Sequence, residues 1–325
     1  MQTIRQFVKG SDESAWVKVM NSAYKEYSDW RAITLEELLA EEANSSFRCD
    51  ERFVADIDGQ PVGVLHVCLE DSKKGAKGLV ETLAIIPEFR CLGIEERLVK
   101  TAIDEVRKKG TRTIQIPRLR WSRFNEKGGV DFLERLGFVL VRKTSLMAAE
   151  LASIPSGIEV NVKTVTRRVE KDSAEDIELL SRLRNECSNE EFNYRQTTIE
   201  ETRSLLLQNP FSYLECRFAV IDNKPVGYVA VAVDEKYNAE RRTKTGIILG
   251  VGVLKSHRGK GIGTCLVLQG LEGLRALGMT RAALDVDDFN QSEAKKLYEK
   301  VGFGIIESYL TYEMNLPHTR VKSYP

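Results

Sequence analysis

The chain is poor in the residues from which metal sites and disulfide scaffolds are built. It has three histidines and six cysteines among 325 residues, and no two cysteines form a CxxC pair. A histidine-rich zinc site is therefore not expected, and we predict no metal cofactor. Scattered cysteines of this kind are typical of reduced thiols in a cytoplasmic protein.

The chain also lacks a net charge and a long apolar segment. Lysine and arginine together number 48, as do aspartate and glutamate, so no overall basic field attracts nucleic acid. No apolar run reaches the ~20 residues that span a bilayer, and residues 1–7 lack the apolar core of a signal peptide. We therefore predict a cytoplasmic protein with a small-molecule or peptide partner, and no nucleic-acid or membrane partner.

What the chain does contain is an internal repeat of about half its length. Residues 30–37 (WRAITLEE) match residues 194–201 (YRQTTIEE), and Pro-Val-Gly at 61–63 recurs at 225–227. Both pairs are separated by 164 residues (194 − 30 and 225 − 61), and later matches drift from this offset by only a few residues. A repeat of this length is a whole domain rather than a solenoid unit.

The two predicted domains span residues 1–152 and 158–325, and a short stretch with proline, serine and glycine lies between them. Each half begins with a β-like segment and helices, continues through a hairpin, and ends with alternating helices and strands. Turn signals at Asp58-Gly59 and Asp222-Asn223 mark the two hairpins. This order predicts a layered α/β domain with a mixed sheet in each half.

Residues 258–263 read Arg-Gly-Lys-Gly-Ile-Gly and lie between an apolar run and an amphipathic helical pattern. The three glycines leave the backbone open at a helix start, where free N–H groups and the helix dipole favour a phosphate. Neither the P-loop pattern nor the dinucleotide fingerprint fits the segment. A glycine-rich turn before an ordinary helix explains these residues about equally well.

A damaged copy of this segment occurs in the first half. Residues 90–95 read Arg-Cys-Leu-Gly-Ile-Glu, so Glu95 stands where the second half has Gly263. A carboxylate ~4 Å from a pyrophosphate adds ~1–4 kcal/mol of repulsion per charge pair. We expect this glutamate to be exposed and able to swing aside, so that anion binding is weakened.

The second half resembles the GNAT superfamily of acetyl-CoA-dependent N-acyltransferases. The superfamily signature R/Q-x-x-G-x-G/A, usually preceded by V-x-P, fits residues 253–263, with Lys255 in place of the proline. A later pattern, Asn followed by A-x-x-L-Y-x-K-x-G-F, occurs at residues 290–303. The resemblance covers most of each half, and the tandem arrangement is similar to that of two-domain members such as the mycothiol synthases.

The resemblance implies two tandem domains, each with a mixed, mostly antiparallel central sheet flanked by helices. It also implies acetyl-CoA as cosubstrate, with the pantetheine arm on a strand edge and the pyrophosphate on the glycine-rich loop. The residues implied to bind it are Val251, Gly252, Val253, Arg258, Gly259, Lys260, Gly261, Ile262, Gly263 and Asn290. Gly252 is expected to allow close approach of the ligand.

The same resemblance implies that Tyr298 is the general acid that protonates the departing thiolate. The alternative is an aromatic side chain that packs the helix and keeps its hydroxyl in water. The general base is less defined, because residues 245–253 contain no carboxylate. Alternation places Asp285 and Asp287 on one face of the next strand, and we favour Asp287. The general base could also be Asp288 or His257, or a chain of water molecules could take the proton.

The first half keeps a carboxylate, Glu81, on the strand before its loop. It departs from the superfamily pattern at two positions. Glu95 replaces the loop glycine, and Leu133 stands where Tyr298 stands in the second half. Because leucine donates no proton, we predict that the first half is catalytically silent. We expect the first half to form one wall of the acceptor pocket or to bury a face between the two domains.

Both repeats contain Thr-x-x-Glu, at Thr34 to Glu37 and at Thr198 to Glu201. This spacing is typical of a capping box at a helix start. The arginine of each repeat, Arg31 or Arg195, could bind a substrate carboxylate, but a structural role fits two retained copies better.

We therefore predict an acetyl-CoA-dependent N-acetyltransferase in which a primary amine attacks the thioester directly and catalysis lies in the C-terminal half. The alternative is a non-catalytic coenzyme A-binding regulatory or scaffold protein. The sequence does not identify the amine, and it is compatible with a monomer or a homodimer.

Overall fold

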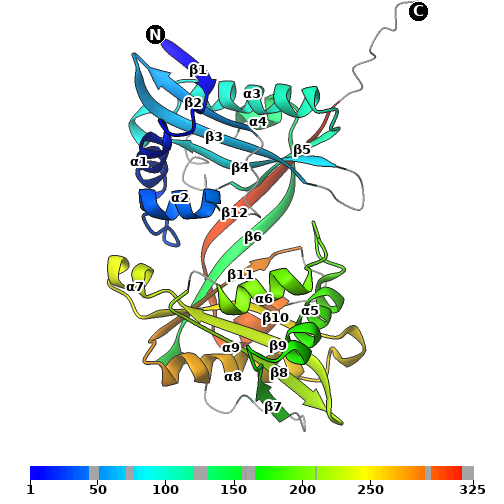
Figure 1. Ribbon diagram of the computed structural model, residues 1–325. Coiled ribbons are helices and arrows are strands. Elements are labelled where there is room, and N and C mark those ends of the chain that lie inside the picture. Colours follow the sequence, from blue (N-terminus) through cyan, green and yellow to red (C-terminus); the bar gives the residue numbers. More distant parts are fainter. Residues whose placement is uncertain are drawn as a thin grey trace, which may run out of the picture. The chain divides into compact units, whose positions relative to one another are not determined.

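The computed structural model describes residues 1–43, 51–70, 76–119, 131–155, 158, 165–208, 211–289 and 294–316. The chain divides into two compact units (Figure 1). Unit 1 contains residues 1–143 and 309–325, and unit 2 contains residues 144–308.

Unit 1 is a sheet with helices on both faces. Its strand order is β1-β2-β3-β4-β5-β12, and only the β4–β5 pair is parallel. The strands are β1 (Gln2–Gln6), β2 (Glu51–Ile57), β3 (Gln60–Glu70), β4 (Lys77–Ile85), β5 (Thr113–Leu119) and the end of β12 (Gly304–Asn315). The helices are α1 (Glu13–Tyr24), α2 (Leu35–Ala43), α3 (Ile94–Lys108) and α4 (Asp131–Arg135).

Unit 2 repeats this arrangement. Its strand order is β6-β11-β10-β9-β8-β7, and only the β10–β11 pair is parallel. The strands are the end of β6 (Val139–Glu150), β7 (Val165–Arg168), β8 (Tyr213–Ile221), β9 (Lys224–Val233), β10 (Thr245–Val253) and β11 (Arg281–Asp287). The helices are α5 (Ala174–Ser188), α6 (Ile199–Leu207), α7 (Glu235–Arg241), α8 (Ile262–Ala276) and α9 (Ala294–Val301). The predicted fold class, a mixed and mostly antiparallel sheet flanked by helices in each half, is confirmed.

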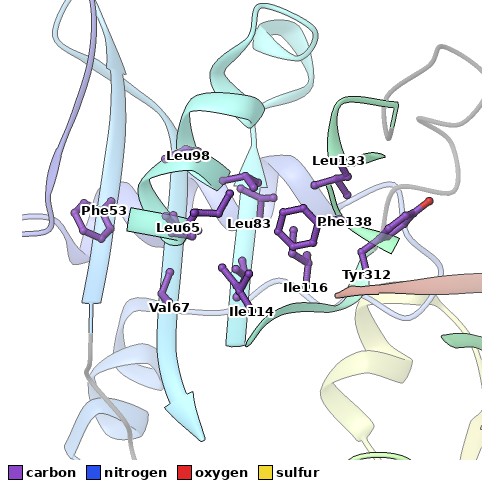
Figure 2. Close-up of a cluster of buried hydrophobic side chains, with 14 of the residues drawn as sticks. Phe53, Leu65, Val67, Leu83, Leu98, Ile114, Ile116, Leu133, Phe138 and Tyr312 are labelled. Atoms are coloured by element: carbon purple, nitrogen blue, oxygen red, sulfur yellow. The ribbon is translucent and has the colours of Figure 1, made fainter. Parts of the chain in front are cut away.

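The closing strands are exchanged between the two sequence repeats. Strand β6 lies at the end of the first repeat yet pairs with β11 from Thr144 to Glu150, and β12 lies at the end of the second yet pairs with β5. The buried side chains of these strands complete the other unit's core: Met147 lies in unit 2, and Tyr312 lies in unit 1 beside Phe138 (Figure 2). The compact units thus differ from the contiguous ranges 1–152 and 158–325, which we keep as the proposed extents of the two repeats.

The predicted hairpin turns are confirmed. Asp58-Gly59 joins β2 to β3, and Asp222-Asn223 joins β8 to β9. All four residues have positive φ, between 48° and 81°, as a two-residue turn with the twist of antiparallel strands requires.

The long helix in each unit is amphipathic as its sequence predicts. Helix α3 buries Ile94, Leu98, Ala102, Ile103 and Val106 against its sheet, and α8 buries Ile262, Leu266, Leu271 and Leu274. Within the described ranges, none of the helices combines the length and the apolar character needed to cross a membrane.

Candidate active site

The parallel strands of unit 2 separate at the end of the sheet where the candidate site lies. Strands β10 and β11 pair over only three residues, from Thr245 to Ile247 on β10. A register shift between Ile248 and Gly250 follows, while β10 stays paired with β9 as far as Val253. Such a bulge bends the strand. The β11-facing edge of residues 250–253 therefore has no ladder partner on β11 among the described residues, so an extended ligand could pair with it.

The glycine at position 252 is explained by packing within the protein. A Cβ at Gly252 would overlap the ring of Tyr228 and lie 2.8 Å from Cβ of Cys187. The ring of Tyr228 thus crosses the strand, and its hydroxyl oxygen lies 3.6 Å from a Cβ built on Gly250. Close approach of a ligand is not needed to account for Gly252, whose side-chain space the protein fills.

The glycine-rich loop leads directly from β10 into α8. Gly259 and Gly261 have φ of 75° and 83°, a left-handed conformation that glycine adopts without strain. Gly261 is the N-cap of α8, and no side chain caps the helix, so its first amides are open to an anion. A Cβ on Gly263 would lie 3.1 Å from a methyl group of Leu297, which means that this glycine also lets α9 approach α8.

The guanidinium of Arg258 holds the loop in place. Its Nε donates to the carbonyl of Val253 (3.1 Å), and its terminal nitrogens donate to Glu190 (3.0 Å) and to the carbonyl of Cys187 (3.0 Å). These contacts tie the loop to the end of α5. Lys260 is exposed, and its Nζ donates to a loop carbonyl at 3.2 Å. Lys260 is thus the more accessible of the two loop cations that the sequence suggests for phosphate binding.

Arg90 plays the same part in unit 1. It donates to the carbonyls of Ile85 (3.1 Å) and Ala23 (2.6 Å) and to the carboxylate of Glu26 (2.5 Å). Two copies with matching contacts indicate that this arginine is retained to join the loop to the preceding helix.

The expectation that Glu95 is exposed and mobile is wrong. Its side chain is only 5% exposed, and its carboxylate accepts a hydrogen bond from the backbone N–H of Cys91 at 2.8 Å. The glutamate folds back over its own loop because an unpaired amide and a helix N-terminus attract a negative charge. The loop of unit 1 therefore already contains an anion. Leu133 is fully buried in the core beside Phe138 (Figure 2).

Tyr298 of α9 is both a core residue and an available proton donor. It is 8% exposed and packs edge-on against Phe303, with ring centroids 5.9 Å apart. Burial, with the nearby charge of Glu191, raises the pKa of Tyr298 to about 12. Its hydroxyl makes no hydrogen bond to any other described residue. The two predicted roles of this tyrosine are thus compatible, because packing holds the ring and leaves the hydroxyl unpaired.

The carboxylates at the end of β11 differ in their hydrogen-bond partners. Alternation is confirmed, since Asp285 and Asp287 lie on the face opposite the buried Leu284 and Val286. One oxygen of Asp287 accepts from the N–H of Phe289 at 2.9 Å.

Asp288 is engaged elsewhere, with Ser145 Oγ at 2.8 Å and Lys295 Nζ at 3.0 Å. His257 lies on the loop, where its Nδ1 and the hydroxyl of Ser256 are 2.9 Å apart. Asn290 lies outside the described residues.

Two further residues of this region carry no sequence motif. Glu191 follows α5 and is exposed, and partial desolvation of its carboxyl group together with the charge of Asp287 raises its pKa. Burial likewise raises the pKa of Tyr228, whose hydroxyl makes no hydrogen bond to another described residue. The fold alone packs Tyr228 against Gly252 and Cys187, so spacing along the chain gives no signal for this contact.

The capping boxes are confirmed. Thr198 accepts from the N–H of Glu201 (3.1 Å), and Glu201 accepts from the N–H of Thr198 (2.7 Å). The adjacent arginine binds the capping glutamate: Arg195 lies 2.7 Å from Glu201, and Arg31 lies 3.0 Å from Glu37. These arginines are part of the helix starts, as the structural interpretation predicts.

Elsewhere in unit 2, a pocket of about 340 Å³ lies between β8 and α8. Its buried Glu215 already accepts from Tyr213 (2.6 Å) and Arg217 (2.6 Å) and pairs with Arg168 (3.0 Å). With its charges balanced, this pocket lacks groups for catalysis. In the described part of the chain, no three histidine, cysteine or acidic side chains are grouped as a metal site would require.

The comparisons with known proteins agree with this architecture. The family model of the acetyltransferase (GNAT) family matches residues 16–138 and 177–303. The mycothiol acetyltransferase of Segniliparus rotundus is 27% identical over 280 residues, which cover 86% of this chain and 99% of that protein. The tandem GNAT protein from the clavulanic acid biosynthesis pathway superposes with a TM-score of 0.73 at 16% identity, covering 98% of this chain and all of that one. A GCN5-related N-acetyltransferase from Sphaerobacter thermophilus has a TM-score of 0.69 at 18% identity, over 97% and 95% of the two chains.

Proposed function

Because this chain belongs to the acetyltransferase (GNAT) family and is an N-acetyltransferase, we propose that its unit 2 transfers the acetyl group of acetyl-CoA to a primary amine by direct attack. The observation that carries this proposal is the separation of β10 from β11 beside an uncapped glycine-rich loop and Tyr298. Unit 1 contains the same loop, but Glu95 occupies it and Leu133 replaces the tyrosine.

The chain's own groups divide the binding of acetyl-CoA between two elements. The edge of residues 251–253 offers backbone groups to the pantetheine arm, and the first amides of α8 with Lys260 receive the pyrophosphate. Arg258 fixes the loop in this shape through its bonds to Val253, Glu190 and Cys187. Asn290 is proposed to contact the pantetheine arm.

The chemistry proceeds by one displacement. An ammonium group gives up a proton to a carboxylate, for which Asp287 is the candidate from the sequence, and the free amine attacks the thioester carbon. The C–S bond then breaks, and Tyr298 protonates the thiolate and regains a proton from the acylated nitrogen. A phenol with a pKa of about 12 suits this task only where the thiol is also hard to ionise. In the same unit, burial raises the pKa of the Cys187 thiol to about 12, which supports the proposal that a coenzyme A sulfur enclosed there is also hard to ionise.

The acceptor is proposed to be the primary amine of a small molecule or of a peptide. The curated relatives are called mycothiol acetyltransferases, so an amine precursor of a mycothiol-like thiol belongs among the compounds to be tested.

Release of free thiol from acetyl-CoA, measured with a panel of amines, tests the proposal. We expect amine-dependent thiol release together with a mass increase of the amine by one acetyl group. Tight binding of acetyl-CoA without transfer to any amine would instead favour the non-catalytic alternative.

A further inference from the structure

A β-bulge occurs at the same place in both units. In unit 1 the register of β4 against β3 skips Glu81, and in unit 2 the register of β10 against β9 skips Leu249. The two extra residues are 168 positions apart (249 − 81), as are Arg90 and Arg258 (258 − 90), so they are equivalent. Bulges next to active sites re-aim a side chain, which makes this position a candidate for contact with a ligand.

In unit 1 the bulge carries a polar cluster. One carboxylate oxygen of Glu81 accepts a hydrogen bond from the thiol of Cys68 at 3.3 Å, and the other lies 4.0 Å from Nδ1 of His66. Cys68 and His66 are buried on β3, whereas the side chain of Glu81 is half-exposed. The two buried side chains therefore hold the carboxylate where solvent reaches it.

In unit 2 the same positions are apolar. Ala230 and Ala232 of β9 take the positions of the histidine and the cysteine, at the 164-residue offset of the hairpins (230 − 66 and 232 − 68). Both alanines are buried, whereas Leu249 is 38% exposed. The bulge of unit 2 thus presents an apolar side chain to solvent where unit 1 presents a carboxylate.

Leu249 directly precedes the strand edge that is proposed to bind the pantetheine arm. An exposed leucine is common on protein surfaces, but this one has β9 on one side and lies where β11 leaves β10 on the other. Ile248 is buried in the core with α8, so alternation places Leu249 on the opposite face. On that face a Cβ built on Gly250 would approach the hydroxyl of Tyr228 at 3.6 Å. The space beside the leucine is therefore bounded by a glycine and a phenol.

We propose that Leu249 contacts an apolar group of the acceptor near its amino nitrogen, and that unit 2 therefore selects amines with an aliphatic or aromatic substituent over amines with a second charge there. This inference rests on the proposed function, in which the amine attacks a thioester held on the edge of residues 250–253. An acceptor that reaches the thioester beside this edge covers the methyl groups of Leu249 and removes them from water. A second charge on the acceptor would instead lose hydration against the leucine.

The substitution Leu249→Ala tests this contact, with Leu277→Ala as its matched control. Leu277 has nearly the same exposure (39%) but lies at the end of α8, away from the glycine-rich loop that precedes this helix. The probes are hexylamine and cadaverine, a diamine of the same overall length. We expect the wild-type protein and L277A to favour hexylamine in kcat/KM. L249A should lose roughly tenfold or more for hexylamine, with little change for cadaverine.

Leu249→Glu copies the residue of unit 1 into unit 2 and carries the opposite expectation. A carboxylate at the bulge attracts the second ammonium group of cadaverine, so the preference for hexylamine should fall by roughly tenfold in L249E. Thermal unfolding of each variant shows that its fold is retained. An unchanged preference in both L249A and L249E, or a wild-type preference for cadaverine, would overturn the inference.

A binding measurement without turnover keeps this inference separate from the proposed function. Calorimetry follows hexylamine binding to the protein saturated with coenzyme A, which has no acetyl group to transfer. We expect the Kd for hexylamine to rise roughly tenfold in L249A and to stay unchanged in L277A. Equal dissociation constants for the wild-type protein and L249A would overturn the inference even if hexylamine is acetylated. Failure to acetylate any amine, with this difference in Kd present, would count against the proposed function alone.

Discussion

At the residue scale, the candidate site depends on whether a buried polar group has a hydrogen-bond partner within the protein. Tyr298 is largely buried, and its hydroxyl makes no hydrogen bond to another described residue. Glu95 is also largely buried, but its carboxylate accepts a hydrogen bond from the N–H of Cys91 in its loop. The two related loops thus differ in that a side chain bonds the loop amide in unit 1, whereas no side chain caps the helix start in unit 2. Two substitutions test this contrast within unit 2.

Replacing Tyr298 by phenylalanine removes the hydroxyl and keeps the edge-on packing against Phe303. We expect turnover to fall by roughly 10²-fold or more, as loss of a positioned acid does, with little change in the Kd for acetyl-CoA. Thiol-release kinetics and calorimetry give the two quantities. Unchanged turnover would remove Tyr298 from the mechanism.

Replacing Gly263 by glutamate copies the first-half sequence into the second half. We expect the Kd for acetyl-CoA to rise by tenfold or more, because a nearby carboxylate costs ~1–4 kcal/mol against a bound phosphate. Gly263→Ala is the control, since a Cβ alone already meets Leu297 at 3.1 Å. Equal dissociation constants for the two variants would assign the effect to packing rather than to charge.

At the scale of single elements, the two long helices start in the same way but differ in what occupies the loop before them. Helices α3 and α8 both begin after a left-handed glycine N-cap, at Gly93 and Gly261, without a side-chain cap. Among the differences in the first turn, Glu95 against Gly263 is the one that places a carboxylate on the loop. Unit 1 thus retains the geometry of the helix start, although the N–H of Cys91 in its loop is bonded to Glu95.

Replacing Glu95 by glycine should open the loop of unit 1. Calorimetry on the wild-type protein should show about one strong acetyl-CoA site per chain, and E95G should add a second, weaker site. The freed amide of Cys91 and the helix dipole provide the physical reason. Two equal sites in the wild-type protein would contradict the view that Glu95 closes the loop.

At the scale of the whole molecule, the exchange of β6 and β12 makes each unit depend on both sequence repeats. Met147, Ala149 and Leu151 belong to the core of unit 2, although they precede the boundary between the repeats. Loss of one buried side chain of this size typically costs ~2–5 kcal/mol, and loss of the whole strand costs more. A separated C-terminal half therefore lacks part of its own core.

Expressing residues 1–152 and 153–325 as separate chains tests this dependence. We expect each fragment alone to be insoluble or to melt well below the intact protein, and coexpression to give a 1:1 complex. Thermal unfolding and mass determination of the complex are the measurements. A fragment 153–325 that alone melts at the temperature of the intact protein would show that β6 is dispensable to unit 2.

What the sequence by itself determined is the set of features fixed by neighbouring residues. Asp-Gly and Asp-Asn turns, Thr-x-x-Glu capping boxes, the glycine helix starts and the apolar spacing along α3 and α8 depend on residues a few positions apart. Those contacts recur wherever the local pattern recurs. The repeat and the motif around Tyr298 likewise identify the fold and the family without coordinates.

What only the tertiary structure decided is where side chains distant in sequence meet. Arg258 joins its loop to the end of α5, and Tyr228 fills the space of Gly252 against Cys187. The closing strands exchange because their apolar faces complete cores built by the other repeat, and alternation along a strand does not say which core that is. Burial depends on the whole fold, and so the tertiary structure alone shows that Glu95 bonds its own loop while the start of α8 has no side-chain cap.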